Sequence, residues 1–276
     1  MKKIKIFDTH THDYFESFDS DREQMLADDF ASGVKHKIQI GCDMDTSKQA
    51  IELAHTSNKM FATVGLHPCY VEENFENLDK SFIYFKEELE KNYKNNTTTK
   101  KIVAIGETGF DFYHNDSPKM REHQQISFEK HIELCKKYTL PIIIHTRNAR
   151  NETLEFLQKN IITKNKEISG VIHCFSENAE FAKIVTTQFN FFISIGGAAT
   201  YPKSHDIRDA ILHTPIQYIV TETDSPYLAP QSVRGKRNQS KNIKEIIELI
   251  ANIKKMNSEE CSNILFENAK RLFNMN

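Results

Sequence analysis

Histidine and acidic residues occur in this sequence at positions where they could bind metal ions. His10 and His12 lie two apart in an apolar segment, and residues two apart on a β-strand point to the same face. The two imidazoles could therefore reach one ion together. Imidazole and carboxylate are ligands of borderline divalent ions such as Zn²⁺ or Mn²⁺. The further candidates, each in or after a later apolar segment, are Glu107, His145, His173 and Asp224.

Eight short, β-rich apolar segments would position these residues. They are nearly continuous apolar runs, which is typical of buried parallel strands. Amphipathic segments with helical spacing lie between them, and the strands recur about every 30 residues, the length of a βαβ unit. The predicted strands are residues 4–10, 37–43, 60–68, 101–111, 141–147, 170–176, 191–197 and 216–224.

Eight such units predict an α/β fold, a (β/α)8 TIM-type barrel rather than a doubly wound sheet. The chain of 276 residues suits one barrel, and no linker divides it, so we expect a single domain over residues 1–276. A helical tail is expected over residues 241–273, and the polar segment 91–100 is the best candidate for a surface loop. The carboxyl ends of barrel strands meet at one mouth, where active sites are found. The metal-ligand candidates, placed at predicted strand ends, should meet there.

Six ligands exceed what one tetrahedral site uses. Two ions about 3.5–4 Å apart that share a bridging carboxylate account for the set, and Glu107, at the end of the fourth predicted strand, is the candidate bridge. Each residue alone has a structural interpretation: a single histidine such as His67 is more often packed in a core, and Asp111 and Asp116 suit ordinary loop positions. The six together favour a metal site, because an unpaired buried carboxylate is costly.

A basic segment follows the last predicted strand, and it could bind phosphate oxygens. Arg234, Lys236 and Arg237 cluster around a glycine, and Arg147 lies two residues after His145. In isolation the segment would be interpreted as a solvated surface charge run. Its place beside the metal candidates favours the phosphate interpretation.

Charge and cysteine content exclude several other classes of protein. The 36 basic and 38 acidic residues give a net charge of −2, so any binding of nucleic acid must be local. Five cysteines without a C-x-x-C pair do not indicate a disulfide framework, and we expect reduced thiols and a cytoplasmic location. No segment has the apolar run of a signal peptide or a membrane span. We expect a monomer that binds no membrane.

The motifs together resemble those of the TatD-related deoxyribonucleases, a branch of the amidohydrolase-like metal-dependent hydrolases. They cover nearly the whole chain in order, and G-E-x-G-x-D and E-T-D-x-P are the most specific. The matching segments are FDTHTH at 7–12, VGLHPCY at 64–70, IGETGFDF at 105–112, PIIIHTR at 141–147, VIHCFS at 171–176, TETDSPYLAP at 221–230 and RGKRN at 234–238.

The resemblance implies a two-metal barrel that hydrolyses DNA phosphodiesters, often from the 3′ end, with single-stranded DNA favoured. Carried over position by position, His10 and His12 hold one ion with Asp224. As a separate hypothesis, Asp224 also orients the attacking water and accepts its proton. His145 and His173 hold the other ion, and Glu107 bridges and takes part in catalysis. His67 and the 234–237 loop face the substrate phosphate. A glutamate at position 107 favours this branch over dihydroorotase-like relatives, which usually have a carboxylated lysine there.

The sequence departs from the family pattern at Asn148, Gln239 and Ser240, where members commonly have Asp, Glu and Pro. These positions bear on substrate positioning rather than metal binding. Two alternatives stay open: hydrolysis of another ester or amide bond, including a tRNA ester or RNA, and a non-catalytic metal-binding relative. The metal (Mg²⁺, Mn²⁺ or Zn²⁺), the choice of DNA or RNA, and exonuclease or endonuclease action are also open.

Overall fold

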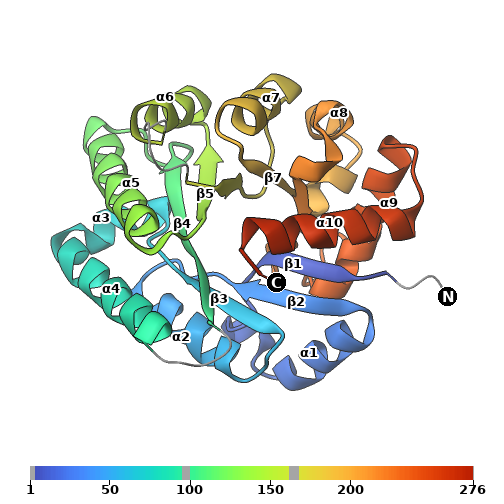
Figure 1. The fold of residues 1–276 in the computed structure, drawn as a ribbon, viewed down its shortest axis with the longest axis horizontal. Coiled ribbons are helices and arrows are strands. Elements are labelled where there is room, and N and C mark those ends of the chain that lie inside the picture. The colour runs from blue at the N-terminus through green and yellow to red at the C-terminus, as the bar shows by residue number, and fades with distance from the viewer. Residues whose placement is uncertain (1–3, 95–99, 162–167, 276) are drawn as a thin grey trace. The chain divides into compact units, whose positions relative to one another are not determined.

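The computed structural model describes residues 4–94, 100–161 and 168–275 (Figure 1). Within these residues eight strands alternate with helices along the chain. The chain separates into two compact units. Unit 1 comprises Met1–Gln39 and His173–Asn276, and unit 2 comprises Ile40–Ile172.

Unit 1 contains four parallel strands. In the first pair, Ile6 lies opposite Val34, and in the second pair Ile193 lies opposite Ile219. Backbone hydrogen bonds also join the segment after the last strand to the first strand, since the Asp224 N–H donates to the His10 carbonyl at 2.9 Å. The strands are β1 (Ile6–Thr11), β2 (Val34–Gln39), β7 (Phe192–Ile195) and β8 (Ile219–Thr221).

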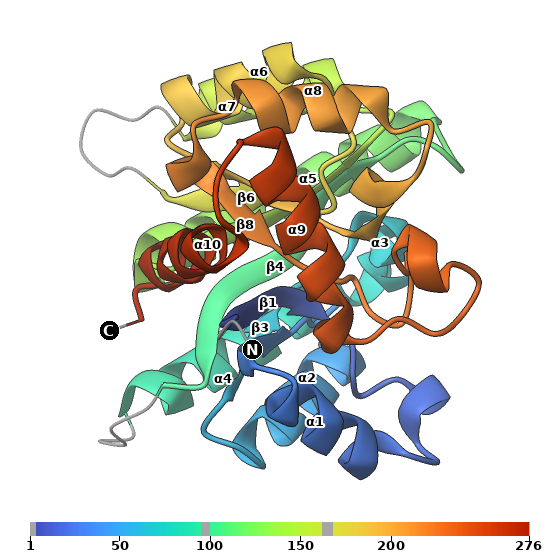
Figure 2. The same cartoon turned by 90° about the vertical axis from the view of Figure 1, so that its right-hand side faces the viewer.

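The helices of unit 1 cover these strands. Figure 2 shows α7 and α8 side by side. Phe266 of α10 packs on Phe7 of β1 with ring centroids 5.9 Å apart, which places α10 against the sheet. The longer helices are α1 (Arg22–Ala31), α7 (Ala179–Gln188), α8 (His205–His213), α9 (Ile243–Ile253) and α10 (Ser258–Leu272).

Unit 2 contains the other four strands, which pair in parallel in chain order. Its core is aromatic, and the stacked rings of Phe128 and Phe156, 4.0 Å apart, join α5 to α6. The strands are β3 (Met60–Val64), β4 (Ile102–Asp111), β5 (Ile142–Arg147) and β6 (Gly170–Ile172). The α-helices are α2 (Met44–His55), α3 (Val71–Asn74), α4 (Leu78–Lys94), α5 (Pro118–Tyr138) and α6 (Arg150–Asn160).

All eight predicted strands are present, with different ends. β2 begins at Val34, three residues before the predicted start, and stops at Gln39. The predicted helical tail is confirmed by α9 and α10. The predicted loop at 91–100 is wrong in its first part, because α4 continues to Lys94, and residues 95–99 of that prediction lie outside the described residues. No helix in the described part of the chain is long and apolar enough to cross a membrane.

Candidate metal centre

Three donor side chains of unit 1 come together where β1 runs beside the segment after β8. The Nε2 atoms of His10 and His12 lie 3.6 and 3.5 Å from Oδ1 of Asp224. The two histidines are buried, and 17% of the Asp224 side chain is exposed. The three donor atoms fall within 4.8 Å of one another, a spacing that suits a shared metal ion.

The backbone holds Asp224 in a conformation that few non-glycine residues adopt. Its φ is 56°, in the left-handed region, and such conformations cluster at functional sites. Two hydrogen bonds fix it, because its N–H donates to the His10 carbonyl and its own carbonyl accepts from the Tyr227 N–H at 2.8 Å. The carboxylate is therefore aimed at the histidines by the fold.

The buried carboxylate of Asp8 links the two chain segments that carry these ligands. Oδ1 accepts from the backbone N–H groups of His10 at 3.2 Å and Thr223 at 3.0 Å. Oδ2 accepts from the hydroxyls of Thr223 and Ser240, both at 2.6 Å. Burial raises the pKa of Asp8 to about 7, against the opposing positive charge of Lys37. Ser240, where the family commonly has proline, thus makes a buried hydrogen bond beneath the site.

A buried ion network fixes the chain that follows β1. Nζ of Lys37 is 2.6 Å from Oδ2 of Asp13 and 2.8 Å from Oδ2 of Asp29, and all three side chains are fully buried. Gln39 extends the network, since its amide donates to Asp13 and accepts from the Asp13 N–H. Removing one partner would leave an uncompensated buried charge, so the network fixes the chain directly after His12.

His173 joins the unit 1 cluster by stacking on His10, with ring centroids 3.8 Å apart. Its Nδ1 lies 3.3 Å from Oε1 of Glu222, which also accepts from the Cys174 N–H at 2.6 Å. A carboxylate on one ring nitrogen fixes the orientation of a histidine ligand and leaves the other nitrogen for the ion. Glu222 is absent from the sequence prediction, although it lies two residues before Asp224 just as His10 lies two before His12.

Charge balance keeps Asp224 ionised. Burial alone would raise its pKa, but the hydrogen bond with His12 and the charges of His173 and His10 outweigh burial and hold the pKa below its ordinary value. An ionised carboxylate among imidazoles is the donor set that divalent transition ions prefer. The cluster therefore fits a metal ion.

Unit 2 contains a second donor cluster. Oε1 of Glu107 lies 2.9 Å from Nδ1 of His145 and 3.3 Å from Nε2 of His67. The donor atoms of the three residues lie within 4.8 Å of one another. His67 Nδ1 accepts a hydrogen bond from the Cys69 N–H at 3.0 Å, which places the ring proton on Nε2, toward Glu107. His67 is therefore arranged as a hydrogen-bond donor.

Glu107 lies within β4 rather than at its end, so that detail of the sequence prediction is wrong. The strand continues to Asp111, and the pairing of β4 with β5 shifts register between Ile105 and Thr108. Gly106 has a φ of 129°, and a Cβ there would lie 2.6 Å from the carbonyl oxygen of Ile143. Only glycine permits this irregular backbone, which presents Glu107 from mid-strand.

The loop interpretation of Asp111 is also wrong. It is the last residue of β4, its side chain is buried, and Oδ2 lies 2.9 Å from Nε2 of His145. Burial opposes ionisation of Asp111, but the hydrogen bond and charge of His145 outweigh it and lower the pKa to about 2. Two buried carboxylates, Glu107 and Asp111, thus share one imidazole, and this excess of negative charge fits a bound cation.

Similarity to known proteins identifies the family. The family described as "TatD related DNase" matches residues 7–274. The chain belongs to the TatD-related DNase family. The metal-dependent hydrolase YabD of Bacillus subtilis is 33% identical over 271 residues, which cover 98% of this chain and 100% of YabD. YcfH of Escherichia coli, also described as an uncharacterized metal-dependent hydrolase, is 32% identical over 274 residues, covering 98% and 96% of the two chains.

Solved structures of TatD homologues confirm the fold. YjjV of Escherichia coli superposes with a TM-score of 0.85 at 25% identity, covering 98% of each chain. A TatD family hydrolase of Entamoeba histolytica gives a TM-score of 0.82 at 21% identity, covering 99% of each. The predicted family and the (β/α)8 barrel are therefore confirmed, and the protein is a metal-dependent hydrolase of the TatD family.

The basic residues of this TatD-family chain differ in their surroundings. The guanidinium carbon of Arg147 lies 3.7 Å from the ring centroid of Tyr113, and that of Arg234 lies 4.3 Å from that of Tyr201. Arg237 instead forms an ion pair with Asp21, at 2.5 Å between Nη2 and Oδ2. Lys236 is exposed.

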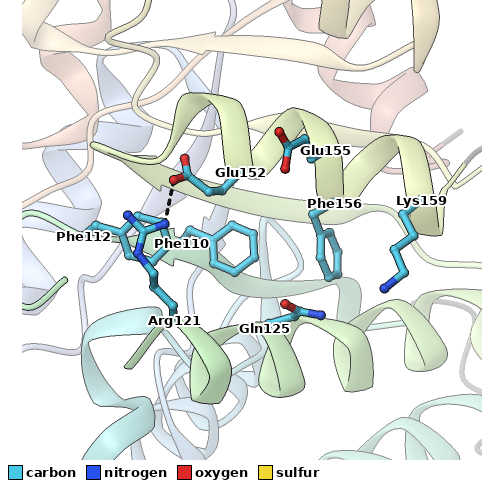
Figure 3. A pocket seen from close by; sticks show the side chains of 8 residues that line it. All are labelled: Phe110, Phe112, Arg121, Gln125, Glu152, Glu155, Phe156 and Lys159. Carbon is cyan, nitrogen blue, oxygen red and sulfur yellow. Dashed lines mark hydrogen bonds and ion pairs between the residues drawn. The ribbon is translucent and has the colours of Figure 1, made fainter. Parts of the chain in front are cut away.

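The pocket drawn in Figure 3 lies on the other face of β4. Phe110 and Phe112 line it, and they alternate along the strand with Asp111, which faces His145. The cavity, of about 340 Å³, lies between α5 and α6, and the ion pair of Arg121 with Glu152 crosses one end. None of the metal-ligand candidates lines this cavity, so it is separate from the donor clusters. The complete lining is Phe110, Phe112, Arg121, Gln125, Glu152, Glu155, Phe156 and Lys159.

Proposed function

We propose that the protein is a nuclease that hydrolyses DNA phosphodiester bonds, with single-stranded DNA preferred and cleavage in the 3′ to 5′ direction. The observation that carries the proposal is the buried cluster of His10, His12 and Asp224, with both histidine Nε2 atoms within 3.6 Å of one carboxylate oxygen. In a family described as DNases, such a cluster supports metal-assisted hydrolysis of a phosphate ester.

Two divalent ions per chain are proposed as the cofactor. His10, His12 and Asp224 would hold one ion, and His145 and His173 the other, with Glu107 in the bridging role that the family resemblance implies. Bound ions would supply positive charge at the phosphate and make a bound water more acidic. The imidazole-rich donor set favours Zn²⁺ or Mn²⁺ over Mg²⁺, which prefers oxygen ligands.

We assign to Asp224 the role of accepting the proton of the attacking water. Its lowered pKa keeps the carboxylate ionised at neutral pH, as a proton acceptor must be, and its partial exposure allows water to reach it. The left-handed backbone at this residue holds the carboxylate in one place. Asp224 therefore both orients the water and accepts its proton.

The remaining assigned residues bind the substrate phosphates. His67 is assigned to this set by the family resemblance, with its Nε2 shared with Glu107 at 3.3 Å, and Arg147 and Arg234 carry guanidinium groups that stack on tyrosine rings. Lys236 and Arg237 complete the set, with the charge of Arg237 shared with Asp21. Phosphate contacts carry no sequence information, so we expect cleavage that is largely independent of base sequence.

The cellular setting is proposed on less specific grounds. The five cysteines form no disulfide bonds, which supports a reducing, cytoplasmic location. A monomer is the proposed working unit.

A nuclease assay with end-labelled substrates tests this function. Chelator-treated protein is supplied with Mg²⁺, Mn²⁺ or Zn²⁺ and incubated with single- and double-stranded DNA and with RNA. The expected result is shortening of single-stranded DNA from the 3′ end, only with an added ion. Cleavage of RNA alone, or of a small ester or amide but no DNA, would replace this function with the corresponding alternative. Inactivity with every ion and substrate would indicate a non-catalytic relative.

A further inference from the structure

Tyr113 and Arg147 form an exposed stack at the carboxyl ends of β4 and β5. Tyr113 is the second residue after β4 and is 55% exposed, a large fraction for an aromatic side chain. Arg147 is the last residue of β5, and its guanidinium carbon lies 3.7 Å from the tyrosine ring centroid. The short distance places the guanidinium directly on the ring face, as in a cation–π pair.

The stack is tied to the donor cluster of unit 2. The Tyr113 N–H donates to Oδ1 of Asp111 at 3.0 Å, and Oδ2 of Asp111 lies 2.9 Å from Nε2 of His145. The Phe112 N–H donates to the Arg147 carbonyl at 3.0 Å, which holds the two strand ends together. One carboxylate therefore connects the stack to a candidate metal ligand, and little freedom remains to be lost on binding.

The N–H groups of Arg147 are available for a ligand, while its charge also helps to lower the pKa of Asp111. In residues 4–94, 100–161 and 168–275, the Arg147 side chain forms no ion pair or hydrogen bond, so its N–H groups are not used by the protein. Arg237 is the contrasting case, since its guanidinium is paired with Asp21. A planar cation stacked on a tyrosine presents a flat face for an aromatic ring and an N–H edge for an anion.

We propose that Tyr113 and Arg147 form a stacking subsite for one unpaired nucleobase of the substrate strand, with the Arg147 N–H edge on an adjacent phosphate. The proposal rests on the nuclease function and adds the group that recognises the base. Stacking on aromatic and guanidinium planes binds any base, so this subsite selects single strands over duplexes without reading sequence. Bases in a duplex are already stacked on each other and cannot occupy it.

Binding of two single-stranded 12-mers tests the subsite without hydrolysis. One is fluorescently labelled oligothymidylate, and the other is a labelled strand with the same backbone but abasic sites in place of the bases. Each is added to chelator-treated protein. Wild type is expected to bind oligothymidylate at least about tenfold more tightly, the scale of one stacked base. Tyr113→Ala should remove that difference, and Tyr113→Phe should retain it. Arg147→Lys should reduce it while keeping the charge.

The matched control is Tyr93→Ala, because Tyr93 is also an exposed tyrosine with a cation over its ring, Nζ of Lys100 at 3.9 Å. It should bind both 12-mers as wild type does. Equal binding of the two 12-mers by wild type, or an unchanged preference in Tyr113→Ala, would overturn the subsite. If the subsite fails this test but the protein still cleaves DNA when a metal ion is added, the nuclease function stands without the subsite. If the protein cleaves no DNA with any ion, the nuclease function itself is wrong.

Discussion

The Thr223 hydroxyl donates a hydrogen bond of 2.6 Å to the buried carboxylate of Asp8. Thr223 directly precedes Asp224, and Asp8 lies two residues before His10, so this bond fastens two segments that carry metal-ligand candidates. Their alignment therefore depends on a contact that itself binds no ion.

Thr223→Val should lower the free energy of unfolding by about 1–3 kcal/mol, because the buried Asp8 carboxylate loses a donor that nothing replaces. Urea denaturation of the chelator-treated protein measures this. Thr187→Val is the control, since the Thr187 hydroxyl donates to the Lys183 carbonyl at an exposed position of α7 and its loss should cost little. Equal effects of the two substitutions would show that the Asp8 contact has no special role.

Glu222→Gln should weaken metal binding by about 10- to 100-fold, because the carboxylate that orients His173 loses its charge. The amide oxygen can still accept from the Cys174 N–H, so the fold should persist. Titration of Mn²⁺ or Zn²⁺ against a competing chelator gives the affinity. Glu245→Gln, at an exposed carboxylate bonded to Ser232, is the control. Unchanged affinity in Glu222→Gln would remove Glu222 from the centre.

Glu107→Ala should reduce the metal content per chain and lower DNA hydrolysis by more than about 100-fold, since it removes a carboxylate assigned to both ions. Metal analysis after gel filtration and a cleavage assay test this together. Glu152→Gln provides a control at an acidic residue of the same unit that pairs with Arg121. If Glu107→Ala retained normal metal content and activity, the bridging assignment would be wrong.

Arg234→Gln should weaken binding of single-stranded DNA, because one phosphate contact is lost. For the same reason, the slope of log affinity against log salt concentration should decrease in magnitude by about one. Arg237→Gln should change that slope less, since Asp21 already offsets its charge. Fluorescence anisotropy at several salt concentrations compares them. A larger slope change for Arg237→Gln would reverse the assigned importance of the two residues.

His131 should make stability depend on pH. Burial lowers its pKa to about 4 from 6.5, and its Nε2 accepts from the Leu66 N–H at 3.0 Å. Because the folded pKa is below the unfolded one, the unfolded chain takes up the proton first as pH falls. Stability supplied by the neutral ring is complete above about pH 6.5 and is lost progressively toward pH 4.

Denaturation of wild type and His131→Gln between pH 7 and pH 4 measures this effect. The wild-type protein should be more stable than His131→Gln at pH 7, and this difference in unfolding free energy should decrease by about 3 kcal/mol by pH 4. The figure follows from about 1.4 kcal/mol per pKa unit. A wild-type advantage that stays constant with pH would contradict the pKa assignment.

Hydrophobic runs and strand periodicity predicted the eight strands, because burial of a parallel strand requires a continuous apolar sequence. The same alternation placed His10 and His12 on one face. The position of Glu107 within β4 could not be predicted in the same way. It depends on the close approach of Gly106 to Ile143, two residues that lie far apart in the sequence. That contact, which gives β4 its irregular course, exists only in the folded chain.

Asp111 and Glu222 show what strand patterns miss in the site. Both carboxylates face a histidine and belong to the quoted motifs G-E-x-G-x-D and E-T-D-x-P, yet each also has an ordinary loop or strand-end interpretation. Glu222 could have been found from the spacing of E-T-D, which parallels that of H-T-H. The left-handed backbone of Asp224 and the pairing of Arg237 with Asp21 depend on tertiary contacts, so no local pattern predicts them.

The most direct test of the central claim measures metal occupancy and DNA cleavage in the same samples. Chelator-treated wild type and Asp224→Ala are titrated with Mn²⁺, and bound metal and cleavage of end-labelled single-stranded DNA are recorded at each step. Wild-type cleavage should rise with bound metal, and Asp224→Ala should lose both high-affinity metal binding and cleavage. Full cleavage by metal-free wild type, or by Asp224→Ala, would show that hydrolysis does not depend on a metal ion held by Asp224.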